Sequence, residues 1–119
     1  MDYGPYKAKV IFVHDGDTVG LNIDLGFSQY LLAINPLSNK TDITCRLYGI
    51  NAPELWTEEG KASAYYLKQL LPVDTNVMVL SHGYDKYGAR FDGTISLLDG
   101  TNINEKMVAD GYAKTVKYK

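Results

Sequence analysis

The stretch "RLYGINAPEL", which runs from Arg46 to Leu55, brings together side chains that could hydrolyse a phosphodiester. The guanidinium of Arg46 offers planar paired donors for a phosphate, and the carboxylate of Glu54 could take a proton from water. Asn51 lies between them, at a place where a metal site prefers a carboxylate. The alternative interpretation is a strand that runs into a turn, ended by the restricted backbone around Pro53.

Two further polar clusters lie elsewhere in the chain. One contains Asp15 and Asp17 in "HDGDT", and the other, "DKYGAR", ends with Arg90. Taken singly, each cluster has a structural explanation, because Asp-Gly forms turns, arginines occupy solvated strand faces and Glu54 could cap a helix. Together they supply oxygen ligands for a divalent metal from Asp17, Asn51 and nearby carbonyls, a general base, and two arginines that can hold a charged phosphate.

The first of these clusters joins two predicted strands. Asp-Gly lies between two apolar runs, which predicts a hairpin with strands near residues 7–14 and 17–24. The period of two gives the second strand one apolar face, formed by Val19, Leu21 and Ile23. Asp17 continues that row at its end, so its carboxylate must lie at a rim, turn away through a bulge or meet a cation.

The other two clusters are also carried by predicted strands. Residues 42–49 alternate between an apolar row and a polar row that contains Arg46. Residues 76–84 predict a fourth strand, and the alternation from Arg90 onward predicts a fifth. Residues 25–41 predict a long excursion with room for one short strand.

Two helices complete the predicted elements. "TEEGKASAYYLKQLL" has helical spacing, acidic residues at its amino end and Pro72 beyond its carboxyl end. "NINEKMVADGYA" predicts a short helix capped by Asn102 or Asn104 and ended by Gly111. The fold class is therefore β-rich α+β: a small five-stranded barrel, closed or partly closed, with a helix at one end.

Size and composition narrow the class of protein. A chain of 119 residues fits one domain, residues 1–119. The net charge of −2 and the pI near 5.6 argue against strong nonspecific binding of a polyanion. The single Cys45 excludes an intramolecular disulfide and a cysteine zinc site, and we expect it to be buried. The chain has no bilayer-spanning apolar run and no secretory signal at its start, which predicts a cytoplasmic location.

The motifs "DGDTV", "RLYGINAPE" and "DKYGARF", in this order, resemble the staphylococcal nuclease-like (thermonuclease) family. The two predicted helices resemble its first two helices, so the resemblance covers nearly the whole chain except residues 25–41. It implies a five-stranded OB-fold barrel and a calcium-dependent nuclease that hydrolyses DNA and RNA to leave 3′-phosphates. "GIN-PE", with "DLGF" upstream, also resembles a phage-type branch of the family.

The resemblance implies a metal site. Asp17 corresponds to a metal-binding aspartate, with Asp15 behind it. The family's second aspartate is replaced by Asn51, which keeps an oxygen ligand but loses a charge, so weaker Ca²⁺ binding is expected. The carbonyl of Ala52 is retained as a ligand because it needs no side chain.

The resemblance also implies a phosphate site. Arg46 corresponds to the first phosphate-binding arginine, and Glu54 corresponds to the glutamate proposed as general base. Ala89 follows "DKYG" where the second arginine is usual, and Arg90 comes one position later. Arg90 lies on the polar face of its predicted strand. An extra residue in the turn or a bulge at Ala89 would therefore direct its side chain to the phosphate site. Nucleotide contacts are implied for Lys86, Tyr87 and Tyr118.

Two other functions stay open. A noncatalytic module of this fold would bind nucleic acid or a protein partner; Arg46, Glu54 and Arg90 favour the enzyme, whereas the acidic pI and Asn51 favour the module. A purely structural protein leaves the three motifs unexplained. For the enzyme we expect single-stranded or denatured DNA or RNA as substrate and no membrane partner. The long stretch 25–41, or an end that lacks the family's usual third helix, could contact a second subunit in a homo-oligomer.

Overall fold

The computed structural model describes residues 2–34, 36–39, 43–84 and 90–116. The strands and helices within these ranges are, in chain order, β1 (Tyr3–Asp15), β2 (Thr18–Gly26), β3 (Gln29–Leu31), β4 (Thr44–Leu47), β5 (Ile50–Asn51), α1 (Glu58–Leu70), β6 (Asn76–Tyr84), β7 (Arg90–Leu97), α2 (Ile103–Ala109) and β8 (Lys114–Thr115). None of the helices in these ranges is long and apolar enough to cross a membrane.

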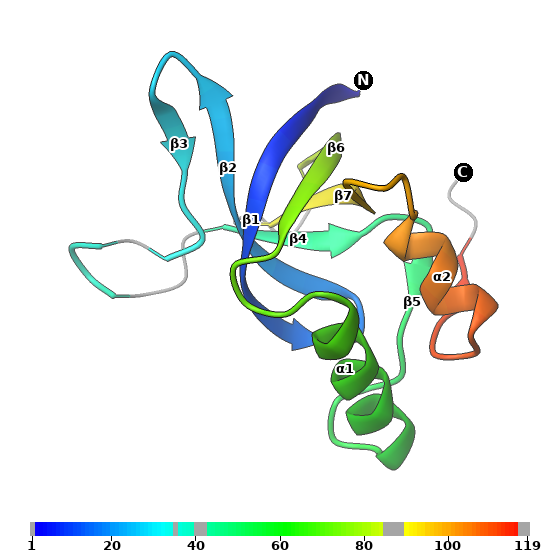
Figure 1. Ribbon diagram of the computed structural model, residues 1–119. Helices are drawn as coiled ribbons and strands as arrows, with labels where there is room; N and C mark the ends of the chain where they lie inside the picture. Colours follow the sequence, from blue (N-terminus) through cyan, green and yellow to red (C-terminus); the bar gives the residue numbers. More distant parts are fainter. Residues whose placement is uncertain (1, 35, 40–42, 85–89, 117–119) are drawn as a thin grey trace.

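Five of the strands close into a barrel. The sheet order is β1-β6-β7-β4-β2, and a further pairing between β1 and β2 joins its two ends. β3 pairs with the outer part of β2, beyond the barrel. Figure 1 shows α1 below the barrel and α2 to one side of it. The five-stranded OB-type barrel with two helices that the sequence predicts is confirmed.

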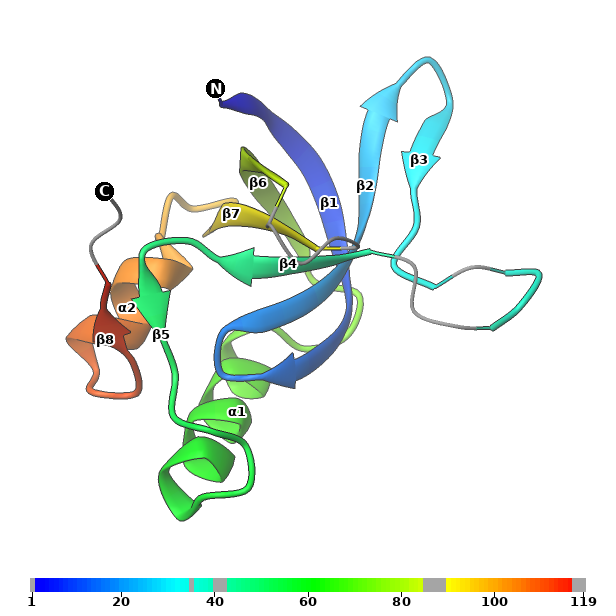
Figure 2. The same cartoon turned by 180° about the vertical axis from the view of Figure 1, so that it is seen from behind.

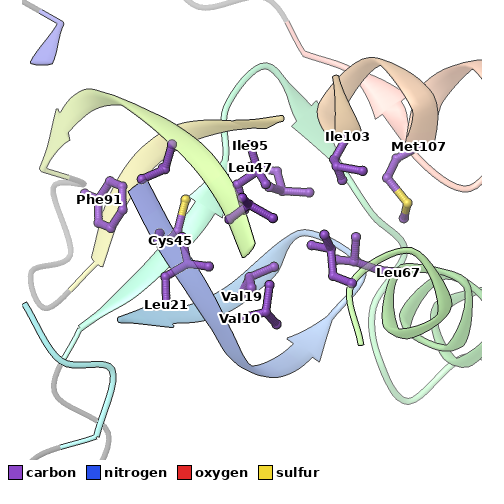
Figure 3. Close-up of a cluster of buried hydrophobic side chains, with 14 of the residues drawn as sticks. Val10, Val19, Leu21, Cys45, Leu47, Leu67, Phe91, Ile95, Ile103 and Met107 are labelled. Atoms are coloured by element: carbon purple, nitrogen blue, oxygen red, sulfur yellow. The ribbon is translucent and has the colours of Figure 1, made fainter. Parts of the chain in front are cut away.

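The barrel interior is apolar, and both helices contribute to it. Figure 3 shows side chains from β1, β2, β4 and β7 converging, with Leu67 of α1 and Met107 of α2 closing one side. The fully buried members include Val10, Val19, Leu21, Cys45, Leu47, Leu67, Ile95, Ile103 and Met107. Cys45 is buried as expected, and this burial raises the pKa of its thiol.

The β1–β2 turn packs against α1. Gly16 and Asp17 form the turn, and a Cβ placed on Gly16 would lie 1.9 Å from Oγ of Ser63 and 2.8 Å from Cβ of Ala52. Only glycine allows this approach, so here the residue serves close packing between turn and helix. The Asp17 N–H donates to Oδ1 of Asp15 at 3.1 Å, which fixes the turn locally.

The stretch 25–41 does contain a short strand. β3 forms a hairpin with β2, and Figures 1 and 2 both show this hairpin standing away from the barrel. Its turn residues Phe27 and Ser28 have φ values of 55° and 59°. Positive φ at both central positions is the geometry that Asn-Gly usually occupies. Phe27 is 99% exposed.

The two candidate caps of the second helix have different roles. Asn102 caps α2, because its side chain accepts a hydrogen bond from the first turn. Asn104 is buried; its Oδ1 accepts from the Ile95 N–H at 3.1 Å, and its Nδ2 donates to the carbonyls of Tyr48 and Gly93 at 2.9 and 3.0 Å. Asn104 therefore ties α2 to the end of β4 and the middle of β7.

Candidate nuclease site

The two arginines lie on adjacent strands. β4 and β7 run parallel, with Thr44 opposite Arg90 and Arg46 opposite Asp92. Leu47 and Phe91 point into the core, so alternation directs both arginines to the outer face of the barrel. Arg46 and Arg90 are thus diagonal neighbours on one surface, which is the placement that a two-arginine phosphate clamp needs.

Asp17 lies at the rim of the barrel, where the predicted hairpin ends. Its Oδ2 accepts a hydrogen bond from the Ala52 N–H at 2.9 Å, and it lies 3.9 Å from Nη2 of Arg46. Its own carbonyl accepts from the Leu47 N–H at 2.7 Å, which fixes the turn to β4. The Asp17 carboxylate, which follows the apolar row of β2, therefore lies at the rim of the barrel and also contacts the Arg46 guanidinium.

The two aspartates of the turn have different proton affinities. Burial raises the pKa of Asp17 to about 6, and the neighbouring Asp15 adds to the rise, whereas the Ala52 N–H and Arg46 oppose it. Burial also acts to raise the pKa of Asp15, but its hydrogen bonds with Asp17 and its contact with His14 leave that pKa below the ordinary value. Asp15 is therefore the more readily ionised of the two.

Asn51 contacts the guanidinium of Arg46. Nη2 of Arg46 donates to its Oδ1 at 3.2 Å. Asn51 belongs to β5, whose partner strand β8 places Lys114 opposite it and Thr115 opposite Ile50. Figure 2 shows β5 and β8 side by side. The segment that follows α2 thus helps to hold the loop that carries Asn51.

Glu54 is held by the first turn of α1. Its carbonyl accepts from the backbone N–H and the hydroxyl of Thr57 at 3.0 and 2.7 Å, and Thr57 in turn caps the helix at Gly60. A Cβ on Gly60 would lie 1.8 Å from the Glu54 carbonyl oxygen. The Glu54 backbone is therefore fixed, while its side chain lies in solvent.

The site residues come together to different degrees. Asp15, Asp17, Arg46, Asn51 and Ala52 form one connected group. Arg90 lies on the adjoining strand of the same face. The residues Lys86, Tyr87, Ala89 and Tyr118, including the expected bulge, lie outside the described ranges.

The sequence did not reveal the structural roles of Gly60, which packs against Glu54, and of Asn104, which bonds to the segments that follow β4 and form β7. Gly60 was visible as a glycine in the first turn of a helix, a position where glycine is otherwise unfavourable. Asn104 was visible as a polar residue between the apolar Ile103 and Met107. Neither signal reveals its partner: Gly60 meets the Glu54 carbonyl through the turn before α1, and Asn104 meets Tyr48 only through the tertiary fold.

The donors suit a hard cation. Oδ2 of Asp17 and Oδ1 of Asn51 both approach the same positively charged nitrogen of Arg46, so this place favours positive charge. Both are oxygen ligands of the type that Ca²⁺ takes. Within the described residues no three carboxylate, imidazole or thiolate groups gather around one point. The side-chain donors that this place offers to a metal are the Asp17 carboxylate and the Asn51 amide.

The five strands close into a barrel with a helix across one end. Two arginines share one outer face of this barrel, beside a carboxylate at its rim. These features define the class of nuclease-like OB-fold domains. The chain matches the family model described as staphylococcal nuclease homologue over residues 44–119, and it belongs to this family.

Two relatives extend the match to the first strands. The chain is 33% identical over 125 residues to endonuclease YhcR of Bacillus subtilis (strain 168), which covers 94% of this chain and 9% of that protein. It is 29% identical over 114 residues to an uncharacterised protein of Bacillus anthracis, which covers 89% of this chain and 45% of the relative. The chain thus spans less than half the length of both relatives.

Proposed function

We propose that this domain is a calcium-dependent nuclease that hydrolyses phosphodiester bonds of DNA and RNA and leaves 3′-phosphate products. The observation that carries the proposal is the placement of Arg46 and Arg90 on one outer face of two parallel strands, next to the Asp17–Asn51 rim. The family membership and the endonuclease relative support the same reaction class.

In the proposed reaction, water attacks the phosphorus and the bond to the 5′-oxygen breaks. The Glu54 carboxylate accepts the proton of the attacking water. Arg46 and Arg90 bind the non-bridging oxygens, whose charge grows as the fifth bond to phosphorus forms. The leaving 5′-oxygen takes up a proton from solvent, so the products are a 3′-phosphate on one fragment and a 5′-hydroxyl on the other.

Asp17, Asn51 and the Ala52 carbonyl would hold the calcium ion. When bound, the ion supplies positive charge that neutralises the attacked phosphate. Arg46 already contacts the Asn51 amide, so the same guanidinium can orient the metal-binding loop and bind the phosphate.

The test is cleavage of heat-denatured DNA and of RNA across a panel of calcium, magnesium, manganese and chelator. Calcium-activated cleavage that leaves 3′-phosphates is expected. Glu54→Gln and Arg46→Ala should each reduce the rate by roughly 10²–10³-fold, the usual cost of one such group. Unchanged rates in both variants would overturn the assignment.

The rival is a noncatalytic binding module, which the amide at position 51 favours, since one carboxylate binds calcium weakly. Titration of calcium in the presence of a nucleoside 3′,5′-bisphosphate separates the two functions. Binding of the nucleotide without cleavage of DNA or RNA at any metal concentration would support the module. Cleavage that follows calcium occupancy would support the enzyme.

A further inference from the structure

A cleft lies beside the candidate site. Its volume is about 500 Å³, which is within the range of pockets that bind small molecules. The loop after β5, the first turns of α1 and the segment that joins α2 to β8 line it, and this side cleft includes Asn51, Pro53, Glu59, Ala62, Tyr112 and Lys114. Because Asn51 is one of the proposed calcium ligands, the side cleft adjoins the proposed metal site.

The wall that follows α2 is fixed to α1. The ring of Tyr112 stacks on the ring of Tyr66, with centroids 4.2 Å apart and 19° between the planes. The Tyr112 carbonyl accepts a hydrogen bond from Oγ of Ser63 at 2.9 Å. Ser63 also lies against Gly16 of the β1–β2 turn. This wall is therefore held in place by α1 and, through Ser63, by the turn that carries Asp17.

Lys114 brings a positive charge to the side cleft. It is exposed and lies opposite Asn51 in the antiparallel pair of β5 and β8. Opposite residues of such a pair direct their side chains to the same face, with Cβ atoms roughly 4.5–5.5 Å apart. Lys114 therefore shares the face of the Asn51 amide, which contacts the Arg46 guanidinium. Arg90, Arg46 and Lys114 thus follow one another from β7 through β4 to β8.

We infer that the side cleft is a subsite for a nucleotide next to the scissile phosphate, and that Lys114 binds the phosphate of that nucleotide. The inference rests on the proposed function and adds a phosphate contact on the side of Arg46 away from Arg90. A polynucleotide carries a phosphate on every nucleotide, so a strand held at Arg46 brings a neighbouring phosphate with it. The subsite continues directly from the proposed metal site, since Asn51 belongs to both.

Glu59 limits how a nucleotide can lie in the side cleft. It belongs to the first turn of α1, where its carboxylate stabilises the end of the helix. Its charge disfavours a phosphate on that side, but it can accept hydrogen bonds from a sugar hydroxyl or a base amino group. The phosphate therefore binds at the Lys114 end, and the sugar and base lie along Ala62 and Tyr112.

The net charge of the chain makes a single local cation important. With a net charge of −2 the domain has little general attraction for a polyanion. Affinity for a strand then depends on local contacts with its phosphates. Arg46 and Arg90 are two such contacts in the proposed function, and Lys114 is a third.

The test measures binding of an oligodeoxynucleotide of about eight nucleotides, a usual site size for one OB fold, in the presence of calcium. The parent protein carries Glu54→Gln to prevent cleavage. Lys114→Gln should weaken binding by roughly 3- to 10-fold, because one charge-assisted contact is lost. It should also reduce the slope of log affinity against log salt concentration by about 0.7, the contribution of one phosphate of a single strand. Ala62→Leu, which narrows the side cleft, should weaken binding to a similar degree.

Two further variants of α1 are matched controls. Lys68→Gln removes the same charge from an exposed lysine in the last turn of α1. Gln69→Leu introduces the same leucine at an exposed position about two turns beyond Ala62. Both controls should bind like the parent protein. Equal affinities of Lys114→Gln and Lys68→Gln would overturn the inference, and so would equal affinities of the two leucine variants.

The nuclease proposal is judged by a separate measurement, cleavage of DNA and RNA by the protein with Glu54 intact. If that protein cleaves but the matched variants bind equally, or the parent protein does not bind the oligonucleotide, the inference fails and the nuclease proposal stands. If that protein does not cleave and the parent protein does not bind, the proposed function fails and this inference fails with it.

Discussion

Arg46 donates a hydrogen bond from Nη2 to Oδ1 of Asn51, 3.2 Å away, across the turn that ends β4. The same nitrogen lies 3.9 Å from Oδ2 of Asp17. One guanidinium therefore stands between the two side chains proposed as metal ligands. In the proposed nuclease, phosphate binding and metal binding are linked through this contact, so a change at Asn51 should affect both.

Asn51→Asp should tighten calcium binding, by roughly tenfold, because calcium affinity follows the number of charged ligands. The measurement is isothermal titration with calcium in the presence of a nucleoside bisphosphate. Asn102→Asp, which adds the same charge at the cap of α2, is the control and should leave the affinity unchanged. Flat or weaker binding in Asn51→Asp would show that Asn51 is not a direct ligand.

Asp17 should make stability depend on pH. Its pKa in the folded protein, about 6, lies above the ordinary value of 3.8, so the folded state holds the proton more tightly. Folding stability should therefore fall as pH rises from about 4 through 6 and stay lower above that window. Asp17→Asn cannot ionise and so avoids this loss of folding stability. Its free energy of unfolding at pH 7 should exceed that of the wild type by at most about 3 kcal/mol.

The check is urea unfolding of both proteins at several pH values, without added metal. The gap between the two free energies of unfolding should open between pH 4 and 6 and close below pH 4. A gap of constant size across the whole range would mean that Asp17 keeps an ordinary pKa in the folded state.

Gly60→Ala should damage catalysis although it suits a helix. Alanine normally stabilises a helix by roughly 0.5–1 kcal/mol relative to glycine. Here its Cβ would meet the Glu54 carbonyl oxygen at 1.8 Å, so the loop that carries the proposed base must move. A shift of about 1 Å can cost roughly 10²-fold in rate. Cleavage rates of Gly60→Ala and of the neighbouring control Lys61→Ala test this; equal rates would count against Glu54 as the base.

Asn104→Ala should destabilise the fold far more than Asn102→Ala. The first change removes the hydrogen bonds of Asn104 with the buried Ile95 N–H and with the carbonyls of Gly93 and Tyr48, at a cost of roughly 2–4 kcal/mol. The second removes one helix cap, worth about 1 kcal/mol. Urea unfolding of the two variants measures the difference. Equal losses would mean that Asn104 contributes only to its helix.

Replacing Phe27-Ser28 by Asn-Gly should stabilise the chain. Both residues have positive φ, which costs side chains other than glycine and asparagine roughly 1 kcal/mol each. Phe27 is 99% exposed and loses no core contact on replacement. Thermal unfolding should show a midpoint raised by a few degrees. Leu37→Asn is the control, because Leu37 is also exposed and its replacement removes apolar surface without changing this turn. An equal rise of the unfolding midpoint in that variant would show that the turn geometry is not the cause.

The fold was largely predictable because its signals are local and repeated. Strand alternation correctly placed Ile43, Cys45 and Leu47 in the core and Arg46 outside. Pro72 marked the end of α1, and Asp-Gly marked the first hairpin. These signals depend on nearest neighbours along the chain, so they survive without knowledge of the tertiary structure.

The details of the candidate site were less predictable, because its contacts join distant segments. For Asp17 the sequence left three alternatives open, a rim, a bulge or a nearby cation, and it gave no sign of the hydrogen bond from the Ala52 N–H. It offered Asn102 and Asn104 as equal caps, and only the packing of α2 on β7 separates them. The Tyr48–His82 stack had no local signal, since a histidine and a tyrosine on different strands carry no periodic pattern.

The parallel pairing of β4 with β7 also bears on when the two arginines can come together during folding. β4 and β7 are separated along the chain by α1 and β6, so closing this contact costs more loop-closure entropy than closing a hairpin between neighbouring strands. Hairpins such as β1–β2 can form without it. A nascent or partly unfolded chain in which β4 and β7 are not yet paired would hold Arg46 and Arg90 apart. It would therefore lack the proposed two-arginine phosphate site.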